Sequence, residues 1–89
     1  MIIAHQMLRM ARVELHVAST GSGTPVVLLH GWPQTWHEWR RVMPLLAGRY
    51  RLIVPDLPGL GDSSRPAGGY DKKAIAADLR QMCERLELG

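Results

Sequence analysis

The chain has 89 residues, a formal net charge of +3 and a single cysteine. That length allows one small domain, and apolar residues, at 46%, are too frequent for an intrinsically disordered segment. The basic residues are scattered rather than clustered, so nucleic-acid binding is not expected, and a lone cysteine excludes an internal disulfide.

The amino terminus has no basic stretch followed by a long apolar one, so a secretory signal peptide is not expected. No apolar run approaches the roughly 20 residues that a membrane-spanning helix needs. These features predict a protein of the cytoplasm that does not associate with membranes.

The first half of the chain predicts a β-hairpin followed by strands of a buried type. Residues 12–17 alternate polar and apolar side chains, as a half-buried strand does, and a weaker strand over about 4–9 precedes them. Residues 25–29 are apolar on both faces, which is typical of a parallel strand covered by helices. Residues 51–55 are a second strand of this kind.

A helix is predicted between the two buried-type strands, over residues 36–47, because apolar side chains recur there at helical spacing. Thr35 is its expected N-cap. With Glu38 it forms a capping box, in which the Thr35 hydroxyl accepts the N–H of Glu38. Pro44 is expected to kink this helix or to end its regular part.

A second helix is predicted over about residues 72–88, with Asp71 as its N-cap and Gly89 as the C′ residue after its end. The whole chain then predicts an α/β fold with a β-hairpin, one right-handed βαβ unit and a further helix. Such a sheet is incomplete, because the chain ends on a helix while a buried-type strand still lacks a neighbour.

Most residues that could carry chemistry have a better structural explanation. Residues 59–61 read Gly-Leu-Gly after a strand, but no helix opens before about residue 72, which argues against a dinucleotide site. Cys83 lies on an apolar helix face. Turn or cap roles explain three loop serines, namely Ser22, Ser63 and Ser64. Metal-ligand spacing is absent among the histidines, which are His5, His16, His30 and His37.

The candidate site with the strongest signal is the segment His30-Gly31-Trp32-Pro33. It follows the end of a buried parallel strand, where ligands bind in open α/β sheets. Gly31 lets the backbone approach a ligand closely, and Pro33 stiffens the segment. The N–H of Trp32 would then be able to stabilise a developing oxyanion. A rigid loop in which His30 only bonds to backbone explains these residues equally well.

These residues resemble the amino-terminal segment of the α/β-hydrolase fold, and most of all its epoxide hydrolase and dehalogenase branch, over the stretch VVLLHGWPQTWHEWRRVMPLLAGRYRLIVPDLPGLGDSSRP. The family's strand and H-G-x-P motif match Val26 to Pro33. Its strand and D-x-P-G-x-G-x-S-x-x-P motif match Asp56 to Pro66. The stretch GGYDKKAIAADL matches the helix that leads toward the nucleophile strand, and the resemblance covers about residues 12–89.

The resemblance implies an oxyanion hole to which Trp32 contributes its backbone N–H. His30, Gly31 and Pro33 are implied to shape that loop. Architectural roles are implied for Asp56, Gly59, Gly61 and Ser63. The resemblance further implies a small-molecule substrate, no cofactor and no metal ion.

The resemblance also implies that catalysis needs residues other than these 89. In the family the nucleophile lies after the next strand, past Gly89, and the acid, the histidine base and the cap come later. In epoxide hydrolases the nucleophile is an Asp that forms an ester, which a histidine-activated water then hydrolyses. Residues 1–89 are therefore expected to be a partial α/β-hydrolase domain that is inactive alone.

Two further functions stay open. One is a hydrolase of the same fold with a Ser nucleophile that cleaves esters or C–C bonds. The other is a small non-catalytic interaction protein that pairs its open strand edge with a partner, and an enzyme completed by a second chain lies between these views. The flat, apolar edge at residues 26–29 is also expected to promote self-association.

Overall fold

The computed structural model describes residues 2–30, 35–68 and 70–88. Its elements, in chain order, are β1 (Ala4–Arg9), β2 (Glu14–Gly21), β3 (Thr24–Val27), η1 (Trp36–Trp39, a 3₁₀ helix), α1 (Met43–Leu46), β4 (Tyr50–Pro55) and α2 (Lys72–Arg85). No helix in the described ranges combines the length and apolar character needed to cross a membrane.

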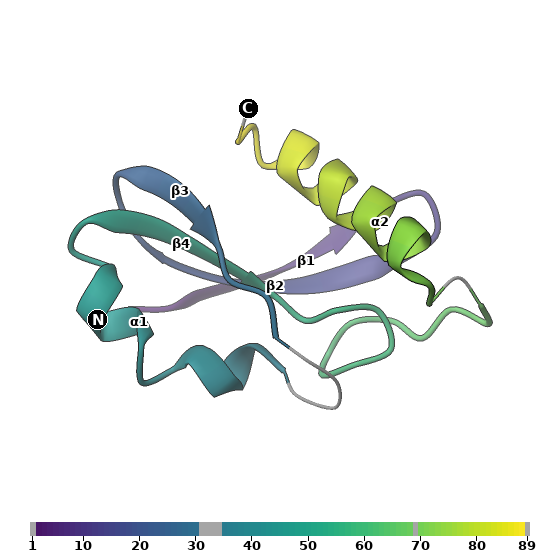
Figure 1. Ribbon diagram of the computed structural model, residues 1–89, viewed down its shortest axis with the longest axis horizontal. Coiled ribbons are helices and arrows are strands. Elements are labelled where there is room, and N and C mark those ends of the chain that lie inside the picture. Colours follow the sequence, from purple (N-terminus) through teal and green to yellow (C-terminus); the bar gives the residue numbers. More distant parts are fainter. Residues whose placement is uncertain (1, 31–34, 69, 89) are drawn as a thin grey trace.

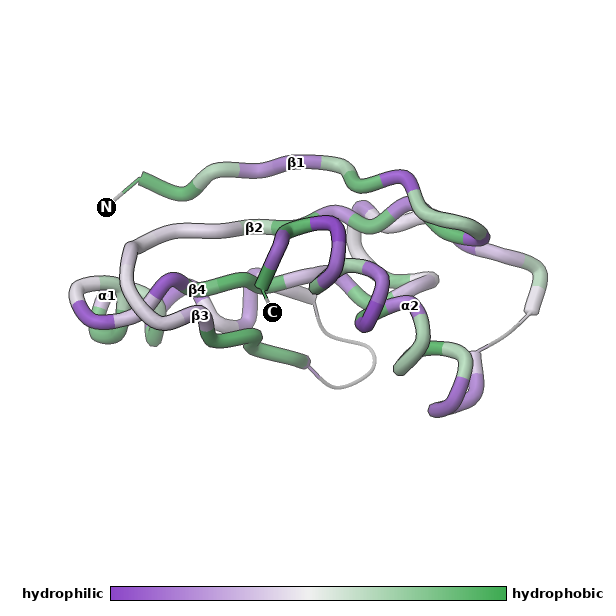
Figure 2. Tube along the Cα trace, turned by 90° about the horizontal axis from the view of Figure 1, so that it is seen from above, coloured by the Kyte–Doolittle hydropathy of each residue, from purple (hydrophilic) through white to green (hydrophobic). Residues whose placement is uncertain are grey.

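The four strands form one sheet in the order β1-β2-β4-β3, which can be followed strand by strand in Figure 2. β1 pairs with β2 and β2 with β4 in antiparallel fashion, whereas β3 and β4 are parallel. The predicted hairpin and the predicted parallel pair are therefore confirmed. The right-handed crossover between β3 and β4 stays a prediction.

The sheet is covered on both faces, with α2 on one side and η1 and α1 on the other (Figure 1). Alternation along the central strands β2 and β4 divides the core between these two layers. The α2 side contains Met10, Val13, Leu15, Val17, Ile53 and Met82. The opposite side contains Ala18, Met43, Leu52 and Val54.

The single helix predicted over residues 36–47 is wrong, because η1 and α1 are separate elements joined by a turn. Pro44 lies in the first turn of α1, where its missing N–H costs nothing. A continuous helix would place the proline ring against the carbonyl of Arg40 and lose a hydrogen bond there. Thr35 caps η1 as predicted, but its hydroxyl accepts the N–H of His37 rather than that of Glu38.

The second helix begins as predicted, since the Asp71 carboxylate accepts the N–H of Ala74. Its end differs from the prediction. The Leu88 N–H donates to the Cys83 carbonyl and the Glu87 N–H to the Glu84 carbonyl, which is the hydrogen-bond pattern of a Schellman motif. The left-handed C′ residue is therefore Glu87, at φ 57°, whereas the predicted C′ residue, Gly89, lies outside the described residues.

This helix end leads to a stability prediction. Replacing Glu87 with glycine should raise the free energy of unfolding by about 1 kcal/mol, because glycine adopts the left-handed conformation without the steric cost of a Cβ. Urea denaturation of the full gene product measures the change. The matched control is Glu84→Gly inside the same helix, which should lower stability by about 1 kcal/mol. Equal losses in both variants would contradict the assignment of Glu87 as the C′ residue.

An arginine ties the turn between β1 and β2 to α2. Arg12 donates from Nε and Nη2 to the two carboxylate oxygens of Asp78, at 3.1 and 2.6 Å. The Asp78 side chain is only 4% exposed and that of Arg12 is 32% exposed. Arg12 also donates from Nη1 to the carbonyl of Gly68. This bidentate geometry suits arginine and not lysine.

Candidate functional site

The candidate site lies where the two parallel strands end. His30 follows β3 and Asp56 follows β4, and because these strands are parallel, both residues lie at the same edge of the sheet. Both are buried, with Asp56 only 1% exposed. A buried carboxylate is stable only when donors compensate for its lost hydration, so its partners define the site.

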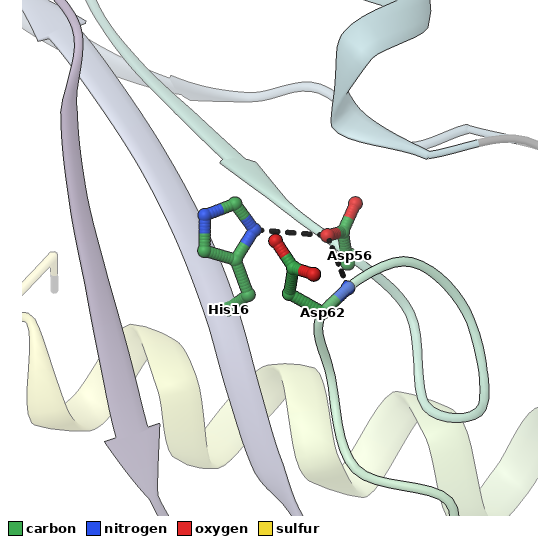
Figure 3. A group of neighbouring side chains, drawn as sticks. All are labelled: His16, Asp56 and Asp62. Atoms are coloured by element: carbon green, nitrogen blue, oxygen red, sulfur yellow. Dashed lines mark hydrogen bonds and ion pairs between the residues drawn. The ribbon is translucent and has the colours of Figure 1, made fainter.

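The Asp56 carboxylate accepts three hydrogen bonds from the described part of the chain. Its Oδ1 accepts the backbone N–H of Trp36 at 2.7 Å, at the start of η1. Its Oδ2 lies 2.8 Å from Nδ1 of His16 on β2 and accepts the backbone N–H of Asp62 at 3.1 Å (Figure 3). A carboxylate oxygen can only accept, so a hydrogen bond between the two side chains requires the His16 tautomer with a proton on Nδ1.

His30 faces the same carboxylate but bonds to the backbone. Its Nε2 accepts the N–H of Leu57 at 3.1 Å and lies 4.0 Å from Oδ1 of Asp56. This backbone bond fits both explanations of the segment, so the role of His30 in shaping the loop stays a prediction. The other members of the predicted loop, Gly31, Trp32 and Pro33, lie outside the described residues. The oxyanion-hole role of the Trp32 N–H therefore stays a prediction.

The loop after β4 folds back on β2 through its serines. Ser63 donates its hydroxyl to the Asp56 carbonyl at 2.6 Å and accepts the N–H of His16 at 2.9 Å. Ser64 accepts the N–H of Glu14 with its Oγ and returns its own N–H to the Glu14 carbonyl. Both serines thus have structural roles, but these contacts join the loop to β2 instead of forming the local turn or helix cap that was predicted.

Gly61 is required by the same cluster. Its φ is +53°, and a Cβ built on it would lie 2.2 Å from Oδ2 of Asp56. Gly59 has a φ of +84°, and a Cβ there would meet the Tyr70 ring at 2.8 Å. A side chain at position 61 would therefore displace the carboxylate, whereas at position 59 it would displace a flexible side chain.

His16 is the residue that sequence reasoning missed. Its strand alternates, which placed its side chain on the face opposite Val13, Leu15 and Val17, and that face was read as solvent-facing. The residue is 5% exposed, because η1 and β1 cover it. Its ring stacks on His5 with Nε2 2.9 Å from the His5 Nδ1, and Trp36 meets the His5 ring edge-on. The signal available in the sequence was Ala18, an apolar residue on the same face.

His16, Asp56 and Asp62 also present possible metal-ligand atoms within 4.8 Å of one another (Figure 3). Both oxygens of Asp56 already accept hydrogen bonds from protein donors, and the His16 nitrogen that faces Asp56 carries one of those protons. This is the geometry of a hydrogen-bonded anchor between loops. It gives no reason to assign a metal ion to these three residues.

The family described as alpha/beta hydrolase fold matches residues 24–89. The chain belongs to this family. It is 48% identical over 84 residues to the soluble epoxide hydrolase of Corynebacterium sp. (strain C12), covering 94% of this chain and 29% of that protein. It is 42% identical over 79 residues to the fluoroacetate dehalogenase of Burkholderia sp., covering 83% of this chain and 26% of that one.

The match extends to solved structures of α/β-hydrolases. The chain superposes on the epoxide hydrolase CorEH with a TM-score of 0.92 and 47% identity, over 96% of this chain and 30% of that one. A putative epoxide hydrolase from Pseudomonas aeruginosa gives 0.88 and 38%. The chain thus corresponds to about the amino-terminal 30% of α/β-hydrolases of the epoxide hydrolase and dehalogenase branch, as the sequence predicted.

Proposed function

We propose that these residues form the amino-terminal part of an epoxide hydrolase-like enzyme of the cytoplasm. The observation that carries the proposal is the 48% identity to a soluble epoxide hydrolase over 94% of this chain, together with the matching fold. Since the chain spans 29% of that relative, the remaining catalytic groups are assigned to residues other than these 89.

The proposed reaction has two steps. An Asp carboxylate attacks one epoxide carbon, the C–O bond breaks, and the ring oxygen takes a proton to become a hydroxyl. A water activated by a histidine then attacks the carbonyl carbon of the ester, which releases a diol and restores the Asp. The tetrahedral intermediate of the second step carries an oxyanion, and the Trp32 N–H is the donor that we assign to it.

The direct test is diol formation from an epoxide such as styrene oxide. The full gene product should form the diol, and the 89-residue chain alone should not exceed the rate in buffer, because it lacks the nucleophile and base. Diol formation by the 89 residues alone, or its absence with a full product that contains an intact Asp nucleophile, would overturn the proposal.

The second candidate is a hydrolase with a Ser nucleophile. It is favoured by 37% identity over 87 residues to the 2-hydroxy-6-oxo-2,4-heptadienoate hydrolase of Pseudomonas putida, covering 93% of this chain. The residue at the centre of the nucleophile elbow in the full gene product decides between the two, because Asp supports epoxide opening and Ser supports ester or C–C bond cleavage.

The strand edge provides a prediction about association. β3 ends the sheet order, and Leu29 just beyond it is 45% exposed, so among the described residues one edge of β3 has no strand beside it. The 89-residue chain should therefore be larger than a monomer in light scattering, since unpaired edges pair with other chains.

Two matched variants test whether the edge causes this association. Leu29→Lys should shift the 89-residue chain toward the monomer, because a charge at a strand edge opposes pairing. Leu45→Lys removes an apolar side chain that is 81% exposed on α1 and should leave the association unchanged. A monodisperse 89-residue monomer with cooperative thermal unfolding would contradict the prediction.

A further inference from the structure

We infer that His16 is a positioning residue for Trp36, at the start of η1, and that it acts through the Asp56 carboxylate. The inference rests on the proposed function, because Trp36 begins the element that follows Trp32, whose N–H is the proposed oxyanion donor, in the chain. It adds to that function a residue on β2 that none of the family motifs in this chain contains.

The described residues His30 and Trp36, which lie near the two ends of the segment 31–34, both hydrogen-bond to residues that follow β4. At one end, Nε2 of His30 accepts the N–H of Leu57 at 3.1 Å. At the other, the N–H of Trp36 donates to Oδ1 of Asp56 at 2.7 Å, a short bond to a charged acceptor. The position of the Trp36 end thus depends on the rotation of one carboxylate.

His16 restrains that rotation because its own position is determined on several sides. Its backbone N–H donates to Ser63 Oγ and its carbonyl accepts the Asp56 N–H. Its ring lies between His5, stacked at 5.1 Å between ring centroids, and Asp56. The His16 side chain is 7% exposed, so water does not readily replace its proton at Oδ2. The Asp62 N–H shares the same oxygen but comes from the loop itself.

Removing the His16 donor should therefore loosen the carboxylate and weaken the Trp36 bond. Supporting groups of this kind act by fixing the geometry of the residues that they contact. The strength of a hydrogen bond to a charged group, about 1.5–3 kcal/mol, corresponds to about a ten- to hundred-fold change in a local opening equilibrium.

The test compares His16→Asn with His16→Leu in the ¹⁵N-labelled full gene product. The two new side chains have similar shapes, but only Asn offers an N–H donor near the position of Nδ1. Hydrogen exchange of the Trp36 amide, taken relative to the amides of β4, should be about ten- to hundred-fold faster in His16→Leu and close to wild type in His16→Asn.

A stability control separates positioning from general destabilisation. Val17→Ala removes a buried side chain on the opposite face of the same strand, and it should speed exchange of Trp36 and β4 amides together. The inference would be overturned if the exchange rate of the Trp36 amide, relative to the β4 amides, were the same in His16→Leu as in the wild type. It would also be overturned if Val17→Ala raised this relative rate as much as His16→Leu does.

A measurement on the wild type needs no variant to fold. Long-range ¹H–¹⁵N correlations of the His16 ring should show a proton on Nδ1, and an unprotonated Nδ1 would refute the inference because no hydrogen could then reach Asp56. These readouts do not require activity. Failure to form a diol would therefore contradict the proposed function only. The hydrogen exchange of the Trp36 amide would still decide the role of His16.

Discussion

Asp56→Ala should lower the free energy of unfolding by about 3–5 kcal/mol, because each buried donor that is left without an acceptor costs about 1–3 kcal/mol. The substitution leaves three donors without their acceptor: the His16 ring nitrogen and the backbone N–H groups of Trp36 and Asp62. The carboxylate is 1% exposed, so water does not easily take its place. Urea denaturation of the full gene product, followed by circular dichroism, measures the loss.

Two neighbouring substitutions show whether the carboxylate itself is responsible. Asp62→Ala keeps the backbone N–H that bonds to Asp56 and removes only an exposed side chain, so stability should change by no more than about 0.5 kcal/mol. Asp56→Asn keeps the side-chain volume and one acceptor oxygen, so its loss of stability should lie between those of Asp56→Ala and Asp62→Ala. A loss under about 1 kcal/mol in Asp56→Ala would show that the three donors find other partners.

Arg12→Ala should lower the free energy of unfolding by about 3 kcal/mol, because Asp78 would remain buried without its cation. The lower end of the range for buried pairs applies, since the Arg12 side chain is 32% exposed and water reaches part of it. Arg12→Lys should recover only part of the loss, because an ammonium group cannot bond both oxygens in the planar geometry of a guanidinium.

A double-mutant cycle isolates this ion pair. Arg12→Ala combined with Asp78→Ala should be less damaging than the sum of the single changes, since the double variant buries no unpaired carboxylate. Arg9→Ala, which removes an exposed arginine from the same hairpin, serves as the control and should cost no more than about 0.5 kcal/mol. Strict additivity of the Arg12 and Asp78 losses would contradict an interaction between them.

The local patterns that the sequence predicts correctly are those that neighbouring residues create together. The alternation over residues 12–17, the apolar run at 25–29 and the mainly apolar stretch 51–55 lie within the strands of the structure or overlap with them. Asp71 caps α2 because its side chain needs only the N–H three residues ahead. Pro44 also signals the break between η1 and α1, but instead of the expected kink or end of one helix it lies at the start of a second.

The end of α2 at Glu87 could not be predicted from neighbouring residues alone. Glycine is the common residue in the left-handed position after a helix, so Gly89 was the better sequence candidate. Leu88 packs against the core cluster beneath α2, and this apolar contact accompanies the Schellman motif that ends the helix two residues earlier. Leu88 is partly buried there, and this burial offsets part of the cost of about 1–2 kcal/mol for a non-glycine residue in that conformation.

The sequence by itself determined the family, the strand and helix types and the H-G-x-P and D-x-P-G-x-G-x-S segments, because each depends on residues close together in the chain. Only the tertiary structure decided that His16 is buried and that it meets Asp56, 40 residues away, or that Arg12 meets Asp78, 66 residues away. The physical reason is that these polar contacts join residues on different strands, loops and helices, which meet only in the folded chain. Whether a polar side chain is buried depends on the elements that pack over its face of the sheet, and the alternation within one strand carries no information about those elements.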